Sequence, residues 1–259
     1  MMQNAYIFQN HLKGENTMTT KEKINIYRTT ATVVGIIYLA GFVVGIGGNI
    51  MIQSILGASN HLATIFASRM SLAIGAILWL TAVAGDAAHG VLMFPILKQH
   101  SERMAFGYLA ARIVDAVFIA IMVLFILIQI PLSSEFLKAA APNTLFLQSL
   151  SSVSAEVSQY AYQIGMSALG VSGLILNYAL YRTKLVPRFV SIWGLLGYAI
   201  ILCGMLSAII GSGLALVSSL PGGLWEVFMG VWLIAKGFNS SAFISQPTRI
   251  KAVPEPLVP

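Results

Sequence analysis

Six long apolar runs dominate this sequence and limit what it can fold into. They cover residues 29–52, 70–97, 104–130, 153–181, 189–217 and 220–238. A helix needs about 20 mainly apolar residues to cross a bilayer, so each run predicts one membrane-spanning helix. Only 9% of the residues are charged and the mean hydropathy is +0.82, whereas an average soluble domain has about 25% charged residues. The composition therefore excludes a soluble enzyme, a nucleic-acid-binding domain and a disordered protein, and it predicts an all-α, polytopic transmembrane bundle.

The segments outside these runs predict the domain organisation. Residues 1–28 are interpreted as a cytoplasmic N-terminal tail, residues 29–240 as the six-span domain and residues 241–259, which contain four prolines, as a flexible C-terminal tail. The first run begins too late and is too long for a cleaved signal sequence, so we expect it to be retained as a span. Met18-Thr-Thr-Lys-Glu-Lys would also make a plausible start, which would make residues 1–17 dispensable.

Two connections between the runs carry local signals. Pro221-Gly222-Gly223 is a strong turn signal and predicts a tight connection between the fifth and sixth spans. Asn60-His61 lies in an uncharged connection between the first and second spans, which we expect to contain a short interfacial helix.

Small residues recur at spacings that favour helix packing. They are found in Gly41-x-x-x-Gly45, Gly47-Gly48 and Gly204-x-x-x-Ala208. Without large side chains at these positions, helix backbones can approach closely. We therefore expect close helix contacts, and a homo-oligomer formed through such Gly-rich faces is one candidate partnership.

The basic residues predict how the spans are oriented. If the N-terminus is cytoplasmic, twelve of the 15 Lys and Arg residues fall on that side of the membrane. Only Arg69 and Lys138 fall on the other side, and Arg112 is inside a span. Because positive charge in short loops remains cytoplasmic, we expect both termini in the cytoplasm.

Ionisable residues inside a span are costly, so each is a functional hypothesis. The second run carries Asp86 and His89, spaced i,i+3 and therefore on one helix face. The third run carries Arg112 and Asp115 with the same spacing. The short connection at 98–103 makes these spans antiparallel neighbours, so we expect the four residues to form one buried polar cluster in which Asp86 pairs with Arg112. Two roles stay open: a structural ion pair, or a ligand or proton site.

A second polar group is expected toward the outer face. Glu156 opens the fourth run and is followed by Tyr160 and Gln163, while Glu226 opens the sixth run. One interpretation is an ordinary membrane interface, where carboxylates reach water and aromatic rings lie among headgroups. The other is an acidic outer vestibule that attracts a cation or an amine.

Several motifs of known chemistry are absent from the sequence. It has no Walker phosphate loop, no HExxH zinc motif and no GxSxG nucleophile elbow. No two histidines lie at matched depths for haem ligation. The single cysteine, Cys203, excludes an intrachain disulfide and a CxxC pair. We therefore expect neither a cofactor nor a metal site.

Local strings near the second, third and sixth spans carry a resemblance to a known family. They are Phe94-Pro-Ile-Leu-Lys-Gln-His-Ser-Glu-Arg, Gly107-Tyr-Leu-Ala-Ala-Arg112-Ile-Val-Asp115-Ala, and Glu226 followed by Trp232-Leu-Ile-Ala-Lys236-Gly-Phe-Asn. Over residues 26–239 the chain resembles the bacterial membrane family called domain of unknown function 4386, which usually has Glu where Asp115 stands. The resemblance implies a multi-pass protein of the bacterial cytoplasmic membrane and implies no activity.

Three functions remain open on these observations. The first is a small-molecule or ion transporter that uses the polar cluster of the second and third spans. The second is a non-catalytic membrane module for sensing, assembly or immunity, which contacts its partner through Gly-rich faces. The third is an intramembrane enzyme acting on lipid or isoprenoid, with His89 and Asp86 as acid and base. The expected surroundings are the lipid bilayer and an unidentified small-molecule ligand, without nucleic acid.

Overall fold

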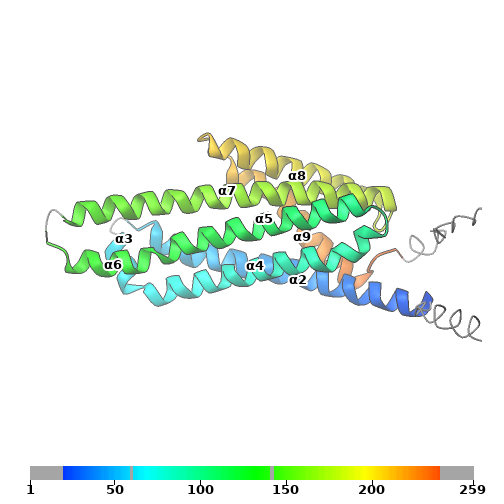
Figure 1. Cartoon of the computed structure of the whole chain (residues 1–259), viewed down its shortest axis with the longest axis horizontal. Coiled ribbons are helices and arrows are strands. Elements are labelled where there is room, and N and C mark those ends of the chain that lie inside the picture. Colours follow the sequence, from blue (N-terminus) through cyan, green and yellow to red (C-terminus); the bar gives the residue numbers. More distant parts are fainter. Residues whose placement is uncertain (1–19, 59–60, 141–142, 240–259) are drawn as a thin grey trace, which may run out of the picture.

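The computed structural model describes residues 20–58, 61–140 and 143–239, and these residues form helices without any strand. The helices in chain order are α2 (Thr20–Leu56), α3 (His61–Ala67), α4 (Arg69–Lys98), α5 (Glu102–Leu127), α6 (Gln129–Lys138), α7 (Asn143–Thr183), α8 (Arg188–Ile209) and α9 (Ala215–Ala235). Figure 1 shows the long helices lying side by side along one axis.

Six helical segments are long and apolar enough to cross a membrane: α2, α4, α5 continued by α6, α7, α8 and α9. Their outward faces are apolar as well; Val43 is 70% exposed and Leu196 is 62% exposed. Such a surface requires an apolar solvent, since contiguous exposed apolar area is rare on soluble monomers. The predicted all-α, six-span membrane bundle is therefore confirmed.

The six spans form a closed ring in chain order. Each packs against the next one along the chain, and α9 packs back against α2. At this closure the backbones of Gly35 on α2 and Gly230 on α9 are so close that a Cβ on Gly35 would lie 2.6 Å from the Gly230 carbonyl oxygen. Arg28 ties the same two helices by donating to the carbonyl of Ile234 at 2.7 Å. The interior of the ring is consequently lined by all six spans.

One end of the bundle, here called the basic end, lies at the right in Figure 1. Helices α2, α5 and α8 begin at this end, whereas α4, α7 and α9 end there. It carries Arg28, Lys98, Arg103, Arg188 and Lys236. The described chain enters and leaves the bundle at this end, and its location in the cytoplasm stays a prediction.

The predicted turn at Pro221-Gly222-Gly223 is wrong. These residues lie inside α9, and the connection between the last two spans is at residues 210–214, where Gly211 has φ +93°. Membrane helices tolerate Pro and Gly because neighbouring helices satisfy the freed backbone groups. Here the Pro221 carbonyl accepts a hydrogen bond from the Trp193 indole at 3.2 Å, and Gly222 allows α8 to approach at Gly197.

The ends of the first span and its following connection also differ in detail from the hydropathy pattern. Residues 20–28, interpreted above as tail, form the first turns of α2. The rest of that tail and residues 241–259 lie outside the described residues, as does Asn60. The short helix expected after the first span is present as α3.

The small residues divide into two groups. Gly48 and Gly204 lie at close helix contacts: an added Cβ would be 2.9 Å from the Gly75 carbonyl oxygen and 2.0 Å from the Ser218 hydroxyl, respectively. Close approach is thus confirmed for these positions. Among the described residues, nothing lies within 4 Å of such a Cβ at Gly41 or Gly45, so these two glycines lie at no close contact within the described bundle.

We expect Gly35→Val to destabilise the bundle, because the new side chain must push α9 away from α2 and open the ring. Overpacking of this kind costs roughly 1–3 kcal/mol. The measurement is the thermal unfolding temperature of the purified protein in detergent. Gly41→Val is the matched control, since it places the same side chain on the same helix in open space; equal unfolding temperatures for the two variants would contradict the closed ring.

Candidate functional site

Arg112 on α5 lies between two carboxylates. Its Nη2 donates to Oδ1 of Asp86 on α4, and its Nη1 lies 3.5 Å from Oδ2 of Asp115 one turn along α5. Arg112 is 4% exposed and Asp115 1% exposed, while the Asp86 side chain keeps 31% exposure. The expected contact between Asp86 and Arg112 is thus present, and Asp115 joins it.

His89 is one turn from Asp86 on α4 but faces different partners. Its Nδ1 shares a hydrogen bond with the hydroxyl of Tyr108 on α5, and its ring contacts Tyr38 of α2 edge-on with centroids 4.5 Å apart. His89 is 1% exposed, and its Nε2 is buried with no hydrogen-bond partner among the described residues. A buried, unpartnered ring nitrogen costs free energy.

Glu226 belongs to this interior region, and its predicted position at the opening of the last span is wrong. Helix α9 begins eleven residues earlier, at Ala215. The Glu226 carboxylate accepts a hydrogen bond from the Tyr198 hydroxyl of α8 at 2.7 Å, and it lies within electrostatic range of Arg112. The reason for the error is the misplaced turn, which shortened the sixth span and moved Glu226 to its end.

These side chains lie at similar depths. Asp86 is twelve residues from the basic end of α4 at Lys98, or ~18 Å at about 1.5 Å per residue. Arg112 is ten residues from Glu102, or ~15 Å, on the same scale. The hydrocarbon core of a bilayer is about 30 Å thick, so a membrane boundary at the basic end of these helices would place this depth near its middle.

The members from the other helices match that depth. Tyr38 is ten residues from Arg28, or ~15 Å, and Glu226 is nine residues from Ala235, or ~14 Å. We call this set the central layer; its residues are Tyr38, Asp86, His89, Tyr108, Arg112, Asp115, Tyr198 and Glu226. Trp225, which is 0% exposed, packs against the rings of both Tyr38 and Tyr198 and closes the layer from the α9 side.

The remaining residues of the expected outer vestibule lie on α7, away from the central layer, and their role as a vestibule stays a prediction. Glu156 and Tyr160 are exposed on α7, and Gln163 is half-buried with a buried, unpartnered Oε1. Helix α7 begins at Asn143, so Glu156 is well inside the helix instead of opening it. The structure therefore brings Asp86, His89, Arg112 and Asp115 together with Glu226, and leaves the other three vestibule residues outside that group.

Three tyrosines of the central layer were missed from the sequence. Tyr38 is 7% exposed, and Tyr108 and Tyr198 are each 1% exposed. Tyrosine in a membrane protein is usually found at the interface. A tyrosine ten residues inside an apolar run is therefore a signal, and counting depth from the basic residues of each run would have found Tyr38 and Tyr198.

The central layer has an excess of acid groups. The layer holds three carboxylates and one guanidinium: Asp86 and Asp115 contact Arg112, whereas Glu226 bonds to Tyr198 and pairs with no cation in the described part of the chain. With all three ionised, two negative charges lack a cationic partner, and a cationic His89 would offset only one. Uncompensated charge is expensive away from water, so this arrangement favours bound protons or a bound cation.

Comparison with known proteins identifies the family. A family model described as "Domain of unknown function (DUF4386)" matches residues 33–237, which include most of the first span, the other five spans and the whole central layer. No curated protein and no solved structure matches the chain. The match covers well over half of the sequence, so the resemblance noted above is confirmed: this protein belongs to the DUF4386 family of domains of unknown function.

Proposed function

We propose that the protein is a membrane transport protein that moves protons across a bacterial cytoplasmic membrane, and that the central layer is its proton-binding site. The observation that carries this proposal is the excess of carboxylates over guanidinium at mid-membrane depth. Carboxylate and histidine groups inside membrane spans are typical of proton relays.

The surroundings of each group support proton exchange over a purely structural role. His89 is hydrogen-bonded to Tyr108 through Nδ1, which places an imidazole beside the carboxylates of the layer. Asp86 and Glu226 retain partial exposure while the rest of the layer is buried. These two carboxylates are on α4 and α9, the two neighbours of α2 in the ring. Because they are the carboxylates of the layer that keep some exposure, we expect protons to enter and leave the layer through them.

The charge distribution supports the proposed orientation. The basic end holds most of the Lys and Arg residues of the described chain, whereas Arg69 and Lys138 are at the opposite end. Under the positive-inside rule, the basic end faces the cytoplasm. Protons would then be exchanged between the central layer and two compartments of different pH.

A second function is favoured by one observation, the empty space beside Gly41 and Gly45. A Cβ at either position meets nothing within 4 Å, so this face of α2 is free to pack against another helix. Small-x-x-x-small faces promote helix association in membranes. A sensing or assembly module would use this face, and Gly41→Val would then break the assembly without changing proton movement.

An intramembrane enzyme receives less support. His89 is enclosed by Tyr38 and Tyr108 and is 1% exposed, which leaves a lipid or isoprenoid little access to the imidazole. Asp86 bonds to Arg112, so acid–base work with His89 would require that ion pair to open.

The proposal is tested with the full chain reconstituted in liposomes that contain a pH-sensitive dye. An inside-negative potential should acidify the lumen of vesicles that contain wild-type protein. We expect Asp86→Asn to abolish this flux, because the neutral amide neither binds a proton nor pairs with Arg112. The matched control is Glu156→Gln, which removes an exposed carboxylate of α7 and should leave the flux unchanged. A wild-type flux equal to that of empty vesicles would overturn the proposal.

The Arg112 contacts also predict an order of stability. Asp86→Ala leaves Arg112 paired with Asp115, whereas Arg112→Ala leaves two carboxylates facing each other without a cation. Breaking a buried pair in this way costs roughly 3–5 kcal/mol, so we expect Arg112→Ala to lower the free energy of unfolding by that amount and Asp86→Ala by less. Chemical unfolding in detergent measures both.

The control for this order is Lys98→Ala, because Lys98 pairs with Glu102 at 3.3 Å on the surface. Exposed pairs contribute about 0–1 kcal/mol, so this variant should resemble wild type. Equal losses for Asp86→Ala and Arg112→Ala would show that Asp115 does not share the charge of Arg112. A variant Asp86→Ala that is stable but inactive in liposomes would separate function from structural support.

A further inference from the structure

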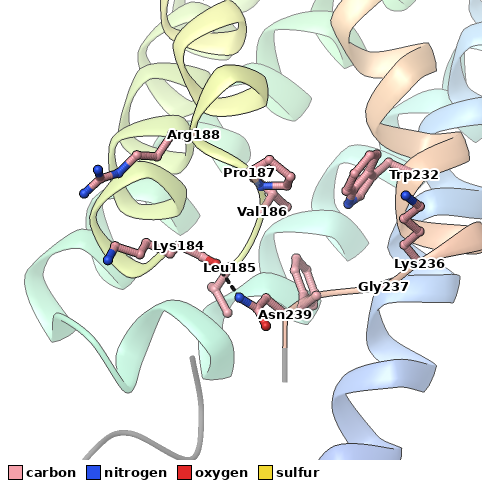
Figure 2. Close-up of a pocket in the computed structure, with 10 residues that line it drawn as sticks. Lys184, Leu185, Val186, Pro187, Arg188, Trp232, Lys236, Gly237 and Asn239 are labelled. Carbon is pink, nitrogen blue, oxygen red and sulfur yellow. Dashed lines mark hydrogen bonds between the residues drawn. The ribbon is translucent and has the colours of Figure 1, made fainter. Parts of the chain in front are cut away.

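A pocket opens at the basic end, between the connection from α7 to α8 and the end of α9 (Figure 2). Leu185 and Val186 are buried in one wall, and Trp232 of α9 stands opposite them. The two walls are joined because the backbone N–H of Asn239 donates to the Leu185 carbonyl at 2.8 Å. The pocket has a volume of about 380 Å³, and this backbone hydrogen bond between distant segments holds its two walls together.

Among the described residues that line this pocket, three are cations and none is acidic. Figure 2 shows the side chains of Lys184 and Arg188 extending from the α7–α8 connection away from Trp232, and Lys236 beside Trp232. The Lys236 ammonium lies 4.6 Å from the centre of the Trp232 ring. Within the part of the chain that the structure describes, none of the three cations is in an ion pair, whereas Lys98 at the same end pairs with Glu102.

A row of aromatic rings continues from the pocket along α8 and α9. Trp232 contacts Phe228 with centroids 5.8 Å apart and Phe189 with centroids 6.5 Å apart, and Phe228 contacts Trp193 at 5.4 Å. Trp193 is five residues into α8, or ~8 Å from its start. We call Lys184, Arg188 and Lys236 at the pocket opening the basic mouth. The aromatic row leads from this mouth toward the apolar part of the bundle, and Phe189, on the outer side of the row, is 59% exposed.

We propose that this pocket binds the phosphate headgroup of an anionic phospholipid, with an acyl chain lying against the aromatic row. An unpaired basic mouth provides charge for a phosphodiester, and basic pockets between membrane helices bind such headgroups. Tryptophan at the junction of mouth and row suits the headgroup level of a bilayer. This proposal is independent of proton movement, since no residue of the central layer lines the pocket.

The chemistry selects an anionic lipid over two simpler ligands. A zwitterionic headgroup carries an additional ammonium, which the cations of the mouth would repel. Inorganic phosphate has the charge but no chain to cover the aromatic row. The pocket should thus prefer phosphatidylglycerol to phosphatidylcholine of the same chain length, and to phosphate alone.

The test uses the full chain in a neutral detergent, titrated with phosphatidylglycerol or phosphatidylcholine whose acyl chains are brominated. Bromine quenches nearby tryptophan, so the quenching beyond that of the unbrominated lipid that is lost in Trp232→Phe reports a chain beside Trp232. We expect wild type to bind phosphatidylglycerol more tightly. The double variant Arg188→Gln/Lys236→Gln should bind it roughly 20-fold more weakly, with little change for phosphatidylcholine.

The matched control is Lys98→Gln/Arg103→Gln, which removes two positive charges from the same end of the bundle but outside the pocket. It should keep most of the preference for phosphatidylglycerol, and Trp232→Phe should reduce the amplitude of quenching. Equal loss in the two double variants would overturn the proposal in favour of diffuse surface charge. Absence of a phosphatidylglycerol preference in wild type, or full competition by an equal concentration of inorganic phosphate, would overturn it as well.

Discussion

The cost of holding Arg112 in the middle of a membrane is the constraint on which much of this structure depends. A guanidinium at this depth needs counter-charges and hydrogen-bond acceptors at the same depth. Asp115 supplies one from the same helix and Asp86 another from α4, and α9 adds Glu226 within electrostatic range. Helices α4 and α5 must therefore keep their relative positions along the bundle axis, because a shift of one turn would leave a buried charge unpaired.

Close packing around the ring makes room for this layer and holds it. Gly35 with Gly230, and Gly197 with Gly222, bring backbones together at two different helix contacts. Polar contacts then lock the last two spans, since the buried Trp225 indole donates to the Val190 carbonyl at 2.7 Å. Several side chains inside the ring are aromatic, whereas those at the closest helix contacts are small. This difference in size allows the six helices to enclose a polar interior.

The two proposed sites lie in different environments and carry an excess of opposite charge. The central layer has an excess of carboxylates in an apolar interior, where neutralisation by a proton is favourable. The basic-end pocket has an excess of cations near the headgroup level, where anionic lipid neutralises them. Helix α9 joins the two, because Glu226 and Trp232 are six residues apart on it. A lipid in the pocket would therefore brace the helix that carries Glu226.

The sequence by itself determined the six spans, their order and the neighbouring charges of Asp86, Arg112 and Asp115, because hydropathy and i,i+3 spacing are local properties. It could not determine that Pro221-Gly222-Gly223 stays helical, since that depends on α8 lying against it. The same tertiary contact decided that Glu226 faces the interior. Tyr38, Tyr108 and Tyr198 joined the layer for a similar reason: their partners are on other helices, His89 for Tyr38 and Tyr108, and Glu226 for Tyr198.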